Sequence, residues 1–260
     1  MQVIDGLHLF LGGLSGILVG FTLGLVGGGG SILAVPLMVY LVGVKNPHVA
    51  IGTSAFAVAA NAATGLLQHA RAGHVVWRCG LMYAAAGIVG ALAGSTLGKN
   101  FDGQKLLFLF ALVMIVVGVV MLRGRKRIES QGAECHRQNA PKVLGYGLGT
   151  GAFSGFFGIG GGFLIVPGLI ASTRMPMINA VGTSLVAVTA FGLTTAFNYA
   201  VSGLVDWPLA AVFIMGGILG GVGGTVVAKR MSGAGTLTSV FAGLIFVVAA
   251  YMLWKSWSAL

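Results

Sequence analysis

Two glycine-rich segments of this chain have the residue types and spacing of a backbone site for an anion. Residues 24–36 read GLVGGGGSILAVP, and residues 155–167 read GFFGIGGGFLIVP. Inside a helix each glycine costs about 1 kcal/mol relative to alanine, so neither run is expected to continue a helix. A helix start is expected after each run, at Ser31 and Gly162, where unpaired N–H groups and the helix dipole attract negative charge. Tight bends or close helix packing are the alternative use of these glycines.

Two shorter echoes follow each glycine run in the same order. The first is Gly-Thr-Ser at residues 52–54 and 182–184, and the second runs from glycine to tryptophan at residues 73–77 and 203–207. A hydroxyl near a helix start can donate to an oxyanion, or it can bond to the carbonyl one turn earlier. Because the triplet occurs in both halves, we treat its hydroxyls as candidate ligands and keep the backbone role as the alternative.

Asn61 lies about two turns beyond the first triplet, within an apolar stretch. An amide in lipid needs a partner, so we expect it to face the bundle interior or a cavity. Contact with a neighbouring helix and contact with a substrate both remain open. The residues from which we expect substrate binding, through backbone N–H groups or polar side chains, are Gly29, Gly30, Ser31, Thr53, Ser54, Asn61, Gly160, Gly161, Gly162, Thr183 and Ser184.

A small basic cluster, His69, Arg71 and His74, follows the same stretch. It predicts either a solvated connection or an electrostatic funnel, formed by His69 and Arg71, that gathers anions at the mouth of a path. The chain has five carboxylates, and none falls inside an expected span. Cation sites and proton relays in membranes commonly use an intramembrane carboxylate. The residues therefore favour a negatively charged ligand, bound without a metal ion or cofactor.

The composition predicts that these residues lie in a membrane. Of 260 residues 57% are hydrophobic and 8% charged, and the mean hydropathy is +0.97. Several apolar stretches reach the roughly 20 residues that cross about 30 Å of hydrocarbon as a helix. They lack the alternation of a membrane barrel, which leaves a helical bundle. The net charge of +10 falls mainly in short connections, where the positive-inside rule accounts for it, and no nucleic acid partner is expected.

Each half is expected to contain the same order of apolar segments. In the first half they are residues 6–26, 31–44, 48–69, 77–98 and 104–122; in the second half they are residues 143–158, 162–173, 176–199, 207–228 and 235–254. Residues 6–44 as one helix would be roughly 58 Å long, too long for a single crossing. The second segment of each half is too short to cross comfortably alone. We therefore expect the first two segments to form a helical hairpin with its tip at the glycines.

The expected fold is all-α, a polytopic membrane helical bundle of two inverted repeats, each a glycine-tipped helical hairpin plus three transmembrane helices. The repeats occupy residues 1–122 and 143–260, joined by a basic cytoplasmic linker at residues 123–142. Three crossings are an odd number, so the second repeat is inverted and both termini face the periplasm. Four crossings per half would give parallel repeats, but would place Arg174 and Arg230 outside, against the positive-inside rule.

Glycines at every fourth position mark two equivalent spans, at residues 90, 94 and 98 and at residues 216, 220 and 224. Small residues at this spacing let helices approach closely. We expect them either to join the two halves or to form the face of a homodimer.

With these motifs present in both halves, the chain resembles the sulfite exporter TauE/SafE family over nearly its whole length. The resemblance rests on the glycine runs with their following prolines, the Gly-Thr-Ser triplets and the Gly-to-Trp segments. The second glycine run departs from the first, with Ile159 among its glycines and no serine at Gly162. The family implies a transporter of the bacterial inner membrane for sulfite, sulfoacetate or a related sulfur-containing anion, often in the direction of export.

We therefore expect a secondary transporter that moves a small sulfur-containing oxyanion by alternating access. Its partners are the anionic substrate and the lipid bilayer. An anion channel and a non-transporting membrane scaffold, which recruits an enzyme through the basic linker, are the alternatives. An enzyme is not expected, because no span combines a nucleophile, a base and an orienting group.

Overall fold

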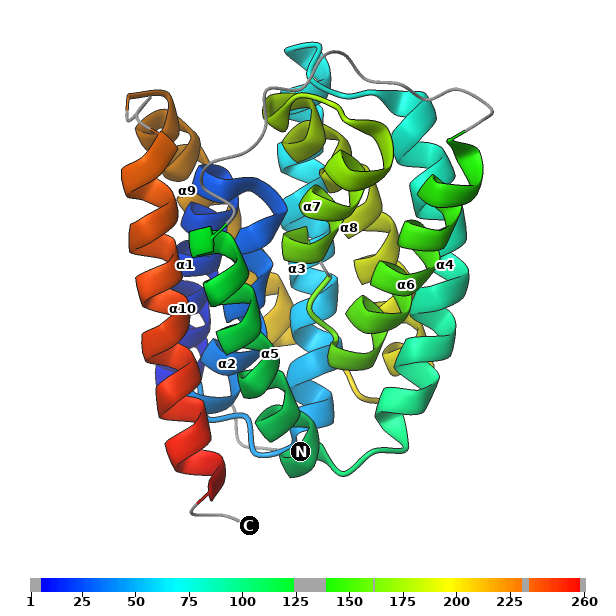
Figure 1. Ribbon diagram of the computed structural model, residues 1–260. Coiled ribbons are helices and arrows are strands. Elements are labelled where there is room, and N and C mark those ends of the chain that lie inside the picture. Colours follow the sequence, from blue (N-terminus) through cyan, green and yellow to red (C-terminus); the bar gives the residue numbers. More distant parts are fainter. Residues whose placement is uncertain (1–5, 124–138, 161, 231–233, 258–260) are drawn as a thin grey trace.

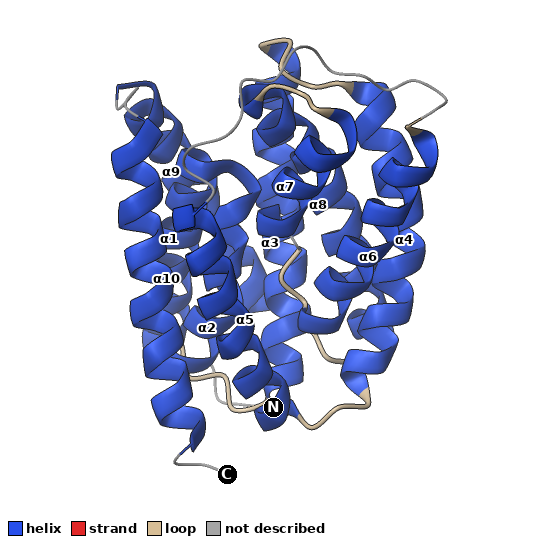
Figure 2. Ribbon diagram, in the orientation of Figure 1, coloured by secondary structure: helices blue, strands red, loops and turns tan. Residues whose placement is uncertain are grey.

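The computed structural model describes residues 6–123, 139–160, 162–230 and 234–257, and within them it consists of helices and turns (Figures 1 and 2). In the first half the elements are α1 (Gly6–Val26), the 3₁₀ helix η1 (Gly27–Leu33), the single turn α2 (Ala34–Pro36), the π-helical turn η2 (Leu37–Leu41), α3 (Pro47–Arg71), α4 (Trp77–Lys99) and α5 (Gly103–Arg123). In the second half they are α6 (Ala140–Phe157), α7 (Gly162–Thr173), α8 (Met177–Val201), α9 (Trp207–Arg230) and α10 (Ala234–Trp257). The expected all-α class is confirmed.

The helices have the length and composition of membrane spans. Five described stretches are long and apolar enough to cross a membrane: Gly6–Leu25, Pro47–Arg71, Trp77–Lys99, Met177–Val201 and Trp207–Val227. Shorter apolar helices accompany them, among them α7. Large apolar side chains such as Phe10, Phe197 and Leu219 are exposed, as expected where lipid is the solvent.

The basic linker expected at residues 123–142 falls mostly at residues 124–138, which lie outside the described residues. α6 begins at Ala140, before the expected start at residue 143. Pro141 lies in its first turn, where the missing N–H of proline breaks no helical hydrogen bond.

The first glycine run turns the chain back on itself, so that α1 and the segment η1–α2–η2 form a hairpin. At the tip the Thr22 hydroxyl lies 3.4 Å from the carbonyl oxygen of Gly30. At the open end Gly43 returns to the start of α1, where a Cβ added to it would lie 3.9 Å from Nε2 of His8. The returning arm is not the regular helix expected from Ser31. It passes from 3₁₀ to π-helical winding, because glycines accept a tight turn and Pro36 has no N–H for a regular ladder.

The second glycine run makes the corresponding turn between α6 and α7. α6 ends at Gly158, whose φ of +68° accompanies a hydrogen bond of 2.8 Å from its N–H to the carbonyl of Ser154. Gly160 is also left-handed, with φ of +65°, and glycine takes this conformation without steric cost. α7 begins at Gly162, where the sequence predicts a helix start. Both halves therefore open with a hairpin tipped by glycine.

The first helix of each half packs against a helix of the other half. α1 packs along α9, and α6 packs along α4. The glycine stripes allow this, because a glycine lets the backbone of one helix reach the carbonyls of the next. The contacts pair Gly90, Gly94 and Gly98 with the carbonyls of Leu148, Ala152 and Phe156, and Gly216, Gly220 and Gly224 with those of Gly13, Ile17 and Phe21. The stripes thus join the two halves, one of the two uses expected for them.

The third helix of each half packs against its counterpart in the opposite direction. Gly192 of α8 meets Ala59 of α3, whereas Gly65, later in α3, meets Leu185, earlier in α8. The connection after α3 accordingly lies at the top of Figure 1 and the connection after α8 toward the bottom. Corresponding helices of the two halves therefore run antiparallel at the centre of the bundle.

Each of these connections docks onto the start of the other half's third helix through the Gly-Thr-Ser triplet. The Thr183 hydroxyl accepts a hydrogen bond of 2.9 Å from the N–H of Val76. The Thr53 hydroxyl accepts one of 2.9 Å from the N–H of Asp206. The glycine of each triplet leaves the space that a loop carbonyl occupies beside the threonine. The two echoes are therefore partners, because each Gly-Thr-Ser triplet holds the Gly-to-Trp connection of the other half.

Arginine is concentrated at one end of the bundle. The helix ends at the top of Figure 1 carry Arg71, Arg78, Arg174 and Arg230, whereas α5 ends lower, at Arg123. The first described helix, α1, begins toward the opposite end, and the last, α10, ends there (Figure 1). The bundle therefore has an arginine-rich end and a terminus-bearing end, as an oriented membrane protein requires.

We expect Gly151→Ala to destabilise the bundle, because the added methyl group would overlap the backbone of Gly87 on α4. Overpacking of this kind costs about 1–3 kcal/mol. Gly149→Ala on the same helix is the control, since open space surrounds it and alanine favours helix. Thermal unfolding in detergent should show a lower Tm for the first variant alone. Equal Tm values would contradict the contact.

Thr183→Val should loosen the connection between α3 and α4, because the N–H of Val76 loses its acceptor, at a cost of about 1–3 kcal/mol. The matched control is Thr189→Val, whose hydroxyl bonds to the Leu185 carbonyl within its own helix. Hydrogen exchange of residues 74–77 should accelerate in the first variant and not in the second. Unchanged exchange in Thr183→Val would show that the triplet does not hold this connection.

Candidate functional site

A small polar cavity lies between helices of the two halves. α1 and α3 of the first half line it together with α8 and α9 of the second. Its volume is about 50 Å³, which is room for a few water-sized groups. The polar residues that line it are Asn61, Thr64, Gln68, His69 and Thr225. None of the described lining residues is acidic.

Asn61 is the polar group buried most deeply in this cavity. The residue is 6% exposed, and both Nδ2 and Oδ1 are buried without a hydrogen-bond partner. Gly217 of α9 packs directly on the amide, and a Cβ there would overlap it. Leaving a buried amide unpaired costs about 1–3 kcal/mol for each unmet group. Since both atoms lack partners, the conclusion holds whichever way the amide is turned. An unsatisfied group at such a depth makes Asn61 a candidate ligand residue.

The two threonine hydroxyls beside Asn61 already donate hydrogen bonds to backbone carbonyls. Thr64 donates to the Asn61 backbone carbonyl at 2.7 Å, and Thr225 donates to the Val222 carbonyl at 2.8 Å. Their oxygen lone pairs can still accept. Among the described lining residues, the Asn61 amide and His69 Nδ1 are buried without a hydrogen-bond partner, and the amide is the one beside these hydroxyls.

The basic cluster predicted as a funnel lies where α3 ends. His69 lines the cavity, and its ring centroid is 5.6 Å from that of His74. Arg71 is exposed two residues further on. His69 thus joins Asn61 at one cavity, while Arg71 lies at the surface of the same end.

The pseudo-equivalent position in the second half is filled by an aromatic ring. Phe191 follows Thr183 by eight positions, as Asn61 follows Thr53. Phe191 is fully buried, packs directly against Gly87 and stacks on Tyr83 with ring centroids 6.4 Å apart. The two halves therefore have the same order of helices but differ at this position, where the first half has the unpaired amide of Asn61 and the second half has the buried ring of Phe191.

A polar latch ties α4 to α8 at the terminus-bearing end. The Lys99 ammonium donates to the Asn198 carbonyl oxygen at 3.1 Å, to Asn198 Oδ1 at 2.9 Å and to the Ser202 hydroxyl at 2.9 Å. These bonds use all three of its donors. Asn198 Nδ2 in turn donates to Ser95 at 2.6 Å. We call the Lys99–Asn198–Ser202 group the latch.

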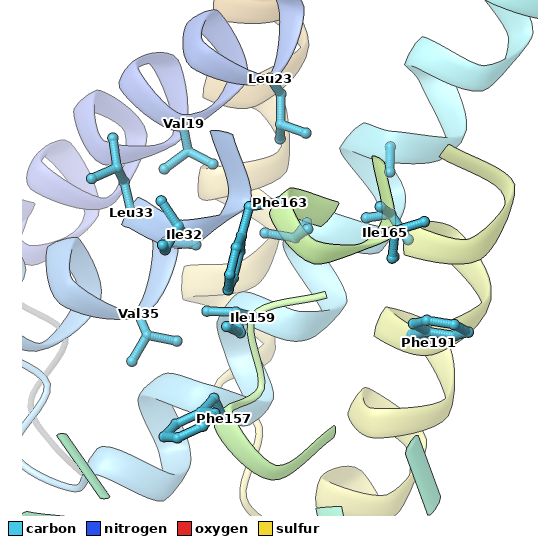
Figure 3. Packing of buried hydrophobic residues seen from close by; sticks show 14 of the residues in the cluster. Val19, Leu23, Ile32, Leu33, Val35, Phe157, Ile159, Phe163, Ile165 and Phe191 are labelled. Atoms are coloured by element: carbon cyan, nitrogen blue, oxygen red, sulfur yellow. The ribbon is translucent and has the colours of Figure 1, made fainter. Parts of the chain in front are cut away.

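The two glycine tips meet, and the side chains around their meeting point are apolar. η1 packs against α7, and Figure 3 shows Ile159 and Phe163 directed toward Ile32 and Val35. Gly160 is enclosed by Val58 and Val188, whose Cγ1 atoms would lie 3.0 and 3.3 Å from an added Cβ. Gly30, Ser31, Gly160 and Gly162 are buried. Gly161 lies outside the described residues, and of Gly29 only the helical backbone is described.

The hydroxyls predicted as ligands lie apart from the cavity. Thr53 and Thr183 accept hydrogen bonds from the docked connections, although each keeps its own proton to donate. Ser54 donates to the Ile51 carbonyl at 3.0 Å and Ser184 to the Val181 carbonyl at 2.7 Å. The serines thus have the backbone role, which was the stated alternative. Ligand contact by all four residues stays a prediction.

Thr64 and Thr225 are lining residues that the sequence reasoning missed. Both have a hydroxyl counterpart 130 positions away, Thr194 and Ser95, but neither lies in the repeated motifs described above. The sequence does contain a signal that could have identified each as a lining residue. Thr64 is three positions after Asn61, on the same helix face. Thr225 directly follows the glycine stripe of α9.

Comparisons with known proteins cover the whole of this architecture. The family model described as "Sulfite exporter TauE/SafE" matches residues 12–252. A probable membrane transporter protein of Xylella fastidiosa (strain 9a5c) is 55% identical over 250 residues, 95% of each chain. The probable membrane transporter protein YunE of Bacillus subtilis (strain 168) is 24% identical over 92% of this chain and 95% of its own length. No solved structure matches the chain significantly.

The resemblance in the repeated motifs is thus confirmed by matches that extend from the first hairpin to α10. The chain belongs to the sulfite exporter TauE/SafE family of membrane transporters.

Proposed function

We propose that this transporter moves a small sulfur-containing oxyanion, such as sulfite or a sulfonate like sulfoacetate, out of the cell across the bacterial inner membrane. The observation that carries the proposal is the Asn61 cavity, in which an unpaired, buried amide faces a space lined by both halves and by no described acidic residue. An oxyanion supplies the acceptor that the amide lacks. The description of the matching family names sulfite.

The proposed mechanism is alternating access between two inverted repeats, with the site at their interface. The antiparallel packing of α3 on α8 supports the inversion, as does the reciprocal packing of α1 on α9 and of α6 on α4. Because the first helices are exchanged, each moving body combines helices from both halves. Rocking would then slide these bodies along the α3–α8 contact.

The positive-inside rule assigns the arginine-rich end to the cytoplasm and both termini to the periplasm. His69 lines the cavity near the arginine-rich end, whereas the latch closes α4 on α8 at the other end. We therefore propose that this conformation is the inward-facing one. An anion that leaves a cell with a negative interior gains about 2.3 kcal/mol per charge for each 100 mV, which favours export.

The glycine tips enter the proposal as a second set of ligands. They meet between the halves, but Ile159 and Phe163 fill the space around them in this conformation. For their N–H groups to reach an anion, these two side chains must withdraw during the cycle. The tips would then bind the substrate in transit, after it leaves Asn61.

Reconstitution in liposomes with a panel of labelled anions tests the proposal. Asn61→Leu should lower the kcat/KM of sulfite transport by roughly ten- to hundredfold, because the buried donor is lost. Thr194→Val is the control, since its hydroxyl bonds to the Ala190 carbonyl within α8. If no small sulfur oxyanion moves or binds, the proposed substrate class is wrong. Unitary currents in single-channel recordings would instead establish a channel.

Lys99→Met should weaken closure of the terminus-bearing end, because the bonds of the latch are lost. We expect hydrogen exchange of residues 198–206 to rise about tenfold or more, as charged hydrogen bonds are worth about 1.5–3 kcal/mol. Lys105→Met, on α5 at the same end, is the control. Equal exchange in both variants would mean that Lys99 does not hold this end closed.

A further inference from the structure

The Asn61 amide offers both a donor and an acceptor, and this restricts which form of an oxyanion it can hold. Nδ2 and Oδ1 are both buried and both without a partner. A ligand that satisfies the two atoms must present an acceptor and a donor side by side. A fully deprotonated oxyanion has acceptors only, so its negative oxygens would leave Oδ1 unpaired.

The side chains next to Asn61 do not correct this mismatch, and the other amide of the lining, Gln68, lies about two turns away at the exposed end of the cavity. The hydroxyl protons of Thr64 and Thr225 already bond to backbone carbonyls, so these side chains supply no further donor. The residues that α1, α8 and α9 contribute to the lining are not ionisable. On α3 the ionisable lining residue is His69, with His74 packed against it. The cavity therefore has no fixed cation beside Asn61 to balance a second negative charge.

We propose that Asn61 selects the singly protonated, singly charged form of a small oxyanion, such as hydrogensulfite. Nδ2 donates to a deprotonated oxygen of the anion, and Oδ1 accepts from its hydroxyl. A cavity with room for a few water-sized groups has the scale of an ion of four heavy atoms. The inference rests on the proposed function and narrows its substrate class to anions such as sulfite, because a sulfonate group carries no hydroxyl at neutral pH. Each turnover then carries one negative charge and one proton together.

Competition against labelled sulfite on the purified, full-length protein tests the selection. Two permanent monoanions without a hydroxyl serve as probes, chlorate for its matching size and methanesulfonate for its sulfonate oxygens. At a pH where hydrogensulfite dominates, we expect both probes to bind roughly ten- to hundredfold more weakly than sulfite, since each leaves Oδ1 unpaired. Probe affinities equal to that of sulfite would overturn the proposal.

Asn61→Leu separates this role from general anion affinity. The variant should bind sulfite more weakly, and its preference for sulfite over the two probes should fall toward one. A preference that survives in Asn61→Leu would overturn the assignment to this residue. Thr194→Val, which leaves the cavity intact, should keep the wild-type preference.

The pH profile of the wild-type protein gives a test that needs no folded Asn61 variant. With total sulfite below saturation, liposome transport should fall as pH rises, in proportion to the fraction of hydrogensulfite. His69→Gln should keep the same midpoint, because the anion and not the histidine sets it. A rate that follows the dianion, or a midpoint that disappears in His69→Gln, would overturn the proposal.

The two levels of the argument fail in different ways. If sulfite is transported but the dianion is preferred, the proposed function stands and the selection by Asn61 falls. If neither sulfite nor the probes bind or move at any pH, the proposed function falls and the inference falls with it.

Discussion

Direct contact between helix backbones is the interaction on which this bundle depends. Lipid gives helices no hydrophobic reason to associate, so they must gain from close packing. Glycines at every fourth position let α4 lie on α6 and α9 on α1, carbonyl against Cα. These contacts bring the long α3 and α8 together at the centre, where their starts hold the connections of the opposite half. The position of the Asn61 cavity follows from this scaffold, because Gly217 belongs to the same α9.

Most of the fold could be predicted from repetition and hydrophobicity. The expected segments 6–26 and 162–173 coincide with α1 and α7, because glycine marks their ends clearly. The helix type of the returning arm in the first hairpin could not be predicted, because 3₁₀ and π-helical winding depends on how the glycines and Pro36 pack against α1. Helix type over such a short segment is a matter of tertiary contact more than of composition.

The candidate site was only partly predictable, for a physical reason. Repeated residues mark what both halves share, and two of them, Thr53 and Thr183, hold the connection of the opposite half. The cavity depends instead on a difference between the halves, Asn61 against Phe191. Polarity in an apolar span identified Asn61 and His69 as candidates. Thr64 and Thr225 required knowledge of which helix faces meet, which a single sequence does not contain.

The packing of each half's first helix on the other half bears on how the two halves arose. Two copies of a half-length chain, inserted in opposite orientations, would form this arrangement if each gave its leading hairpin to its partner, which is how domain-swapped dimers arise. Fusion of the two genes would then free each copy to change alone. A symmetric dimer must carry the same side chain at both equivalent positions. Once the two copies were no longer identical, one half could keep an amide while the other acquired a phenylalanine, giving the centre a polar and an apolar side.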